Sequence, residues 1–192
     1  MMKNIAIFAS GSGTNAENII TYFSTKNSAK VAFVLSNRKD AFVLERATRL
    51  NVPSYFFDRH EFYEKGSVLQ KLVSHNIDFI VLAGFLWLVP GNILKQYSRR
   101  IVNIHPALLP KYGGKGMFGE RVHNAVIREG EKESGITVHF VNESYDEGDI
   151  IFQVRCKIDP EDTPETLARK VHLLEYQHYP RVIEEMILTL AD

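Results

Sequence analysis

Segments with the hydrophobic pattern of a strand alternate along the chain with segments that have the pattern of a helix. Short apolar runs typical of buried strands cover residues 4–9, 31–35, 54–57, 78–83, 101–104, 135–141 and 150–156. Between them, apolar residues recur at helical spacing in a segment with Ile19, Ile20 and Phe23, and in residues 41–50, 60–75 and 119–128. Strands and helices that alternate along a chain build a right-handed parallel sheet with helices on both faces. The pattern therefore predicts an α/β fold.

The last two strand-like runs differ from the others because no helix separates them. Residues 135–141 and 150–156 both alternate cleanly, and a polar loop, residues 142–149, joins them. Such a pair is typical of an antiparallel hairpin. We therefore expect a Rossmann-like, mostly parallel twisted sheet that carries an antiparallel strand pair near its C-terminus.

A final helix follows the hairpin. Thr163 is a suitable N-cap and Pro164 suits the first helical position. The apolar stripe of this helix contains Leu167, Val171 and Leu174. Pro180 lacks a main-chain N–H, so we expect it to kink or interrupt the helix.

The composition limits the class of protein. With 192 residues, 45% of them hydrophobic, the chain can bury one sizeable core, and we expect a single domain over residues 1–192. Lys plus Arg equals Asp plus Glu at 23 each, so no overall field attracts nucleic acid or an anionic membrane. The first apolar run stops at Gly11, too early for a membrane span, which leads us to expect a cytoplasmic protein. The single cysteine, Cys156, excludes an internal disulfide and argues against a thiolate metal site.

Two polar side chains stand at the end of the strand formed by residues 101–104. Asn103 and His105 share one parity, so both point to the same face, and Pro106 ends the strand. In an open α/β sheet, ligands bind beyond the carboxyl ends of the strands. The two residues are therefore candidates for chemistry. The alternative is that Asn103 caps a turn and His105 is a hydrogen-bonded core histidine.

A glycine turn connects the first strand to the first helix. Gly11, Gly13, Thr14 and Asn15 lie where unpaired N–H groups and the positive end of the helix dipole suit a phosphate. The spacing also fits a loose dinucleotide fingerprint, and a simple tight turn is the alternative. After the second strand, residues 37–39 are Asn, Arg and Lys, where NAD binding needs an acidic residue. NADP remains compatible with this segment.

The string Asn103-Ile104-His105-Pro106-Ala107-Leu108-Leu109-Pro110 resembles the signature of folate-dependent formyltransferases. The phosphoribosylglycinamide formyltransferase family, also called glycinamide ribonucleotide transformylases, is the most similar. The resemblance extends over nearly the whole chain through residues 11–15, residues 83–85, Asp146 and Glu175. It implies one formyltransferase domain in which 10-formyltetrahydrofolate donates a formyl group to the amine of glycinamide ribonucleotide, in purine biosynthesis. It also implies a monomer or homodimer with small-molecule substrates, without nucleic acid, membrane or metal.

The resemblance also implies binding residues. Gly13, Thr14 and Asn15 correspond to the loop that holds the substrate phosphate, and Glu175 to a residue that accepts hydrogen bonds from ribose hydroxyls. The folate pocket corresponds to Leu86, Trp87, Leu88 and Val89, together with Asn103. Many family members have a basic or polar residue at the position of Trp87, so this chain departs from the pattern there.

The catalytic residues implied by the resemblance are Asn103, His105 and Asp146. The Asn103 amide is expected to donate an N–H to the developing oxyanion. His105 is expected to protonate the leaving folate nitrogen. Asp146, which we prefer over the neighbouring carboxylates, is expected to raise the pKa of His105 and to assist deprotonation of the amine, through a bound water or directly. The rejected carboxylates are Glu143, Glu147 and Asp149.

Several alternatives stay open. A formyltetrahydrofolate deformylase would use the same triad with water as the acceptor. A methionyl-tRNA formyltransferase is disfavoured by the absence of a basic RNA-binding segment and by zero net charge. A non-catalytic nucleotide-binding module would need only the glycine turn, and a metal hydrolase would use His105, His139 and Asp146. His123, in the helix expected over residues 119–128, is predicted to be exposed or half-buried and without function.

Overall fold

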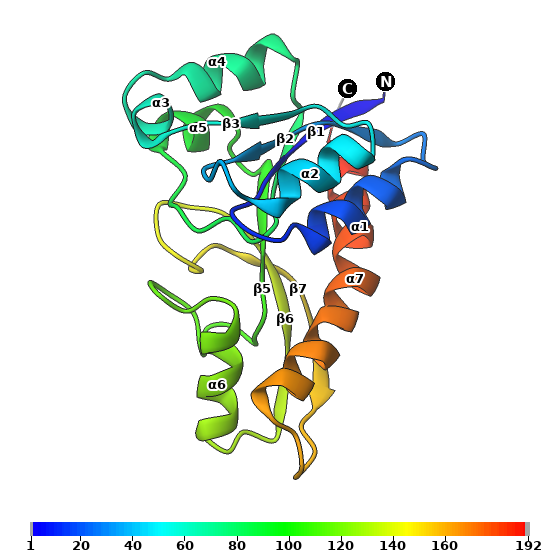
Figure 1. Cartoon of the computed structure of the whole chain (residues 1–192), viewed down its shortest axis with the longest axis vertical. Helices are drawn as coiled ribbons and strands as arrows, with labels where there is room; N and C mark the ends of the chain where they lie inside the picture. The colour runs from blue at the N-terminus through cyan, green and yellow to red at the C-terminus, as the bar shows by residue number, and fades with distance from the viewer. Residues whose placement is uncertain (1, 191–192) are drawn as a thin grey trace.

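A seven-stranded sheet runs through the protein, of which the computed structural model describes residues 2–190 (Figure 1). The strands are β1 (Lys3–Phe8), β2 (Ala29–Ser36), β3 (Ser54–Phe56), β4 (Phe79–Leu82), β5 (Ile101–His105), β6 (Glu133–Phe140) and β7 (Ile150–Lys157). They are ordered β3-β2-β1-β4-β5-β6-β7. The pairs from β3 to β5 are parallel, whereas β5–β6 and β6–β7 are antiparallel. The predicted Rossmann-like, mostly parallel sheet with an antiparallel C-terminal strand pair is confirmed.

Helices cover both faces of this sheet. They are α1 (Thr14–Phe23), α2 (Phe42–Arg49), α3 (Arg59–Tyr63), α4 (Ser67–Ser74), α5 (Gly91–Gln96), α6 (Glu120–Arg128) and α7 (Pro164–Leu188). One core cluster joins Ile5 and Ile7 of β1 to α1, α2, α6 and α7. Another joins Ala6 and Phe8 to α3, α4 and α5. Neighbouring strand residues point to opposite faces, so the two clusters lie on opposite sides of the sheet.

The prediction of one helix over residues 60–75 was wrong, because α3 and α4 are separate helices. Gly66 between them has a φ of 69°, and a left-handed residue ends a right-handed helix. The start of α3 is closed by a capping box, in which the Asp58 carboxylate accepts from the Glu61 N–H and the Glu61 carboxylate accepts from the Asp58 N–H. Each helix therefore has its own local boundary signal.

The last helix, α7, begins as predicted at the Thr163 N-cap with Pro164 in the first turn, and it runs along most of the molecule (Figure 1). The expected interruption at Pro180 was wrong, because α7 continues through it to Leu188. Proline removes the N–H that the carbonyl four residues earlier would receive. That carbonyl, on Tyr176, accepts instead from the Asn18 Nδ2 of α1 at 2.9 Å. Within residues 2–190, no helix combines the length and the apolar surface that a membrane span needs, α7 included.

A second contact fixes α7 to the middle of the sheet. Tyr179 is fully buried, and its hydroxyl lies 2.9 Å from the Leu82 carbonyl of β4 and 3.3 Å from the Val102 carbonyl of β5. Leu82 is the last residue of β4, and Val102 lies in the adjacent parallel strand β5, one residue before Asn103. These two hydrogen bonds therefore fix the position of α7 relative to β4 and β5.

The Asn18 contact predicts a measurable coupling with Pro180. Replacing Asn18 by Ala should lower the free energy of unfolding by about 1–2 kcal/mol, because the Tyr176 carbonyl then loses its donor. In a Pro180→Ala background a main-chain N–H returns to residue 180, so the same Asn18→Ala change should cost clearly less. Urea denaturation of the four proteins measures the coupling. Equal costs in both backgrounds would show that the carbonyl does not depend on Asn18.

Candidate active site

A cavity of about 750 Å³ opens at the carboxyl edge of the sheet. Its walls come from the glycine turn before α1, residues 83–86 after β4, the C-terminal part of β5, the loop at residues 114–119, α6, residues 145–146 and α7. This is the position where parallel α/β sheets bind ligands. Segments that are far apart in the sequence thus meet around one space.

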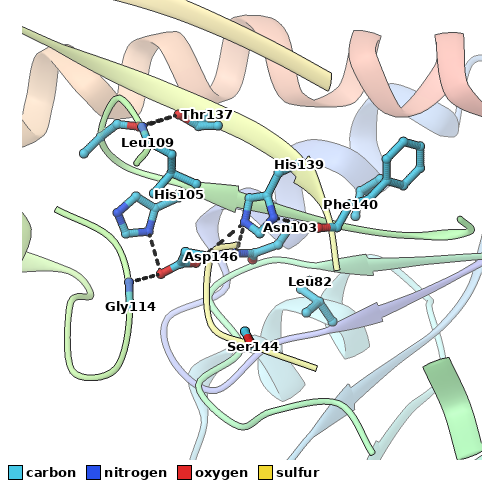
Figure 2. Close-up of polar contacts among 12 residues, drawn as sticks. Leu82, Asn103, His105, Leu109, Gly114, Thr137, His139, Phe140, Ser144 and Asp146 are labelled. Atoms are coloured by element: carbon cyan, nitrogen blue, oxygen red, sulfur yellow. Dashed lines mark hydrogen bonds and ion pairs between the residues drawn. The ribbon is translucent and has the colours of Figure 1, made fainter. Parts of the chain in front are cut away.

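Asn103, His105 and Asp146 all line this cavity. Figure 2 shows their side chains lying close together. His105 Nδ1 lies 3.4 Å from Asp146 Oδ2, and Asn103 Nδ2 lies 3.4 Å from Asp146 Oδ1. The His105 ring is almost fully buried, and its Nε2 lies 2.7 Å from the Tyr112 carbonyl. A carbonyl oxygen can only accept, so Nε2 carries a hydrogen and Nδ1 faces the carboxylate. The structure brings the three predicted catalytic residues into direct contact.

The backbone around Asp146 directs its side chain inward. Asp146 has a φ of 59°, in the left-handed region that a non-glycine residue seldom adopts. Its Oδ2 accepts a hydrogen bond from the Gly114 N–H at 2.9 Å. A Cβ on Gly113 would lie 2.5 Å from Leu109 and 3.2 Å from the Cβ of Asp146. The glycine loop can therefore approach the carboxylate closely because it has no side chain at residue 113.

The net pKa shift of His105 is opposite to the one we expected. Burial of the ring lowers its pKa, and this effect exceeds the upward effect of the Asp146 carboxylate. Burial therefore favours the neutral form of His105, whereas the Asp146 carboxylate favours the charged form. The expectation that Asp146 raises the pKa of His105 was right for the contribution of the carboxylate and wrong for the sum.

Asp146 itself stays ionised. Burial alone would raise its pKa, but interactions with His139 and His105 and the Gly114 N–H together lower the pKa below the ordinary aspartate value. A carboxylate that is charged and mostly shielded from water carries a strong local field. It can stabilise a positive charge that forms on either imidazole.

The predicted phosphate and ribose residues gather elsewhere in the same cavity. Gly13, Thr14, Asn15 and Glu175 all line it. Gly13 has a φ of 77° directly before α1, and a Cβ there would lie 2.4 Å from Val43. Asn15 Nδ2 donates to Glu175 Oε2 at 2.9 Å, while the buried Asn15 Oδ1 has no partner. These residues therefore form one polar site beside the unpaired N–H groups at the start of α1.

The predicted folate residues divide into two groups. Leu86 lines the cavity, whereas Trp87, Leu88 and Val89 are outside its lining. Val89 is buried in the core, and the Leu88 carbonyl accepts a hydrogen bond from the Tyr63 hydroxyl. Trp87 packs in an aromatic cluster with Phe57, Phe62, Tyr63 and Phe85. A folate role for these positions stays a prediction, and it is structurally most direct for Leu86.

Comparison with known proteins decides the family, because residues 3–183 match the family model described as formyl transferase. The chain belongs to this family. It is 37% identical over 191 residues to the phosphoribosylglycinamide formyltransferase of Bacillus subtilis, which covers 97% of this chain and 95% of the relative. The Haemophilus influenzae protein of the same name is 39% identical over 191 residues, in an alignment that covers 95% of this chain and 86% of the relative. A crystal structure of phosphoribosylglycinamide formyltransferase from Streptococcus pneumoniae superimposes with a TM-score of 0.84 at 38% identity, covering 96% and 99%.

Membership of the formyl transferase family removes support from three alternatives. Neither an NADP reductase nor a non-catalytic nucleotide-binding module is favoured. The metal hydrolase would have used His105, His139 and Asp146, which do lie together. However, among residues 2–190 no group of three or more His, Cys, Asp or Glu side chains is arranged to hold a metal ion.

Two histidines in the formyl transferase site were not recognised from the sequence. His139 was considered only as a metal ligand, yet its Nε2 lies 3.1 Å from Asn103 Nδ2. His123 was expected on an exposed or half-buried side of its helix, which was wrong. It is 2% exposed, it lines the cavity, and its Nδ1 is buried without a partner. The strand alternation placed His139 on the face of Thr137, but no local signal marked which histidines would be covered by other segments.

Burial of His123 predicts a pH dependence of stability. Burial lowers its pKa below the ordinary histidine value, so the unfolded chain binds a proton at a higher pH than the native protein. Stability should therefore fall as the pH drops below about 6.5, by at most about 1.4 kcal/mol per pH unit for this group. In a His123→Leu variant this part of the slope should vanish.

Urea denaturation at pH 7.5, 6.5 and 5.5 measures the difference between the two slopes. His172, whose pKa is raised by its hydrogen bond to Glu175, loses stabilisation as the pH rises, but it is present in both proteins. A Val126→Ala variant on the same helix is a control, because it should reduce stability equally at each pH. Parallel slopes for wild type and His123→Leu would contradict the interpretation.

Proposed function

We propose that this protein transfers the formyl group of 10-formyltetrahydrofolate to the amine of glycinamide ribonucleotide, which gives formylglycinamide ribonucleotide in purine biosynthesis. The relatives that cover nearly the whole chain carry the name of this enzyme. The observation that supports it most directly is the contact of an ionised Asp146 with both Asn103 and His105, in a cavity that also contains the glycine turn. We further propose that residues 1–192 act as one formyltransferase domain in the cytoplasm.

The reaction exchanges one C–N bond for another. The amine nitrogen attacks the formyl carbon, a C–N bond forms, and the carbonyl electron pair moves to oxygen. The bond to the folate nitrogen then breaks, and the proton lost by the amine ends on that nitrogen. The site must therefore stabilise an oxyanion and relay one proton.

We assign the stabilisation of the oxyanion to the side-chain amide of Asn103. Its amide projects from the end of β5 into the cavity wall, so an N–H can reach a formyl oxygen without water between them. Removal of a comparable donor in other enzymes costs roughly 3–4 kcal/mol of transition-state stabilisation.

We assign the proton relay to His105 and Asp146. A lowered pKa makes the His105 imidazolium a stronger acid, which suits protonation of a weakly basic folate nitrogen. The hydrogen on Nε2 is bound to the Tyr112 carbonyl, so transfer from this atom requires that contact to be exchanged for substrate. The Asp146 carboxylate stabilises the transient imidazolium and accepts a proton from the attacking amine, directly or through water.

The nucleotide is assigned to the other polar site. The N–H groups that follow Gly13 and the dipole of the ten-residue helix α1 favour a phosphate dianion near Thr14 and Asn15. Glu175 is 4% exposed and lies next to Asn15, so its carboxylate can accept hydrogen bonds from ribose hydroxyls. The pterin is assigned to the part of the cavity that Leu86 lines, and Trp87, Leu88 and Val89 support this wall from outside the lining. Asn103 is assigned a place between the two substrates.

An assay with and without the acceptor tests the proposed reaction. The protein should release tetrahydrofolate from 10-formyltetrahydrofolate only when glycinamide ribonucleotide is present, with one formylated product per folate. Turnover without the amine would instead identify a deformylase, and no turnover in either case would identify a binding protein.

Substitutions at the cavity wall test the assigned roles. Asn103→Ala should lower kcat by about 10²–10³-fold, and Asp146→Asn by about 10²–10⁴-fold. The KM values of both substrates should change little, because these contacts strengthen in the transition state. Asp149→Asn is the matched control, since this exposed carboxylate of the same loop pairs with Arg99 at the surface. Unchanged kcat in both site variants would remove the catalytic assignment.

A further inference from the structure

His139 lies directly beside Asn103 in the sheet, on the antiparallel neighbour β6. It is 2% exposed, and it does not belong to the residues that line the cavity. Its Nε2 lies 3.1 Å from Asn103 Nδ2, and its Nδ1 lies 2.8 Å from the Phe140 carbonyl (Figure 2). The ring therefore connects the backbone of β6 to the side-chain amide of Asn103.

The Phe140 contact determines which ring nitrogen carries the hydrogen. A carbonyl oxygen only accepts, so Nδ1 must donate. In the neutral ring Nε2 is then an acceptor, and the Asp146 Oδ1, which lies 3.6 Å from it, is beyond hydrogen-bond distance. The partner of this acceptor must be a donor, which means that the Nδ2 end of Asn103, and not its Oδ1 end, faces His139.

A second acceptor supports the same orientation of the amide. Asp146 Oδ1 lies 3.4 Å from Asn103 Nδ2, and a carboxylate that is ionised cannot donate. The reversed amide would place Oδ1 against the imidazole lone pair and the carboxylate charge. The two Nδ2 hydrogens differ in their contacts, because the one on His139 is held at 3.1 Å while the contact with Asp146 is long.

We propose that His139 is a positioning residue that fixes the Asn103 amide with one N–H held by the imidazole and the other available to the formyl oxygen. This inference rests on the proposed formyl transfer. His139 acts through Asn103, because the ring is outside the cavity lining and its two nitrogens are both engaged by protein atoms. Without the imidazole acceptor, the amide can rotate and present Oδ1 to the substrate oxygen, which would repel an oxyanion.

Two substitutions separate the acceptor from the bulk of the side chain. His139→Leu removes the acceptor and should lower kcat by about 10–100-fold, less than loss of the whole Asn103 side chain, with the KM values of both substrates within about 3-fold. His139→Gln can present an amide oxygen to Asn103 Nδ2, so its kcat should stay within about 5-fold of wild type. A folded glutamine variant with a larger loss would overturn the proposal, even if the leucine variant does not fold.

A double-mutant cycle shows whether the effect passes through Asn103. In an Asn103→Ala background, His139→Leu should lower kcat by less than about 2-fold, because the group that it positions is already absent. Losses that multiply in the double variant would mean that His139 acts independently of Asn103, and would overturn the proposal.

Val138→Ala is the control for damage to β6. Val138 is fully buried and is adjacent to His139, but its side chain points to the opposite face of the strand. This variant should lower the Tm and leave kcat close to wild type. If His139→Leu behaves in the same way, the role of His139 is only structural and the proposal fails.

An NMR measurement, which does not depend on catalytic turnover, tests this inference separately from the proposed function. In ¹H–¹⁵N spectra, the Asn103 side-chain amide is the NH₂ pair that disappears in Asn103→Ala. In wild type one of its protons should be shifted downfield by the imidazole nitrogen, and His139→Leu should abolish that shift while His139→Gln keeps a bonded proton. An unchanged pair in His139→Leu would refute the positioning role, whereas absence of formyl transfer by wild type would refute only the proposed function.

Discussion

Burial of one charged carboxylate is the constraint on which this site depends. Asp146 is ionised and almost covered by protein, and such a charge is tolerated only where donors surround it. Its polar partners come from separate segments: Asn103 of β5 and Gly114 of the loop after β5 donate N–H groups to it, His105 of β5 faces it at 3.4 Å, and His139 of β6 lies 3.6 Å away. Each segment must be in place before the carboxylate is satisfied. The site is therefore complete only where all of these segments are in place.

The sheet makes this arrangement possible because its direction changes at β5. This strand is parallel to β4 on one side and antiparallel to β6 on the other. The parallel side places the end of β5 beside the ends of β1 and β4, where the cavity opens. The antiparallel side sets His139 directly opposite Asn103. The loop from β6 to β7 then turns at Asp146 through a left-handed residue, which directs the carboxylate at both neighbours.

Helix α7 relates the residues proposed to bind the nucleotide to those proposed to be catalytic. Tyr179 ties the helix to the carbonyls of Leu82 and Val102, and Glu175 is one turn earlier on the same face. Glu175 in turn contacts Asn15 at the start of α1. The distance between the proposed phosphate site at the start of α1 and the amide of Asn103 is thus set by contacts between helices and strands. Preorganisation of this kind reduces the entropy lost when two substrates are brought together.

Local pattern alone determined much of this protein. The alternation of strands and helices, the common parity of Asn103 and His105, and the glycine turn before α1 are properties of neighbouring residues, so they could be interpreted from the sequence. Tertiary structure decided the rest. The direction of the His105 pKa shift depends on how completely other segments exclude water, and the burial of His123 depends on α6 facing the cavity and the core. Where α7 continues through Pro180, the free carbonyl of Tyr176 is satisfied by the Asn18 amide, 158 residues from Tyr176 along the chain. Burial and long-range hydrogen bonds arise from segments that meet only after folding, and no local period encodes them.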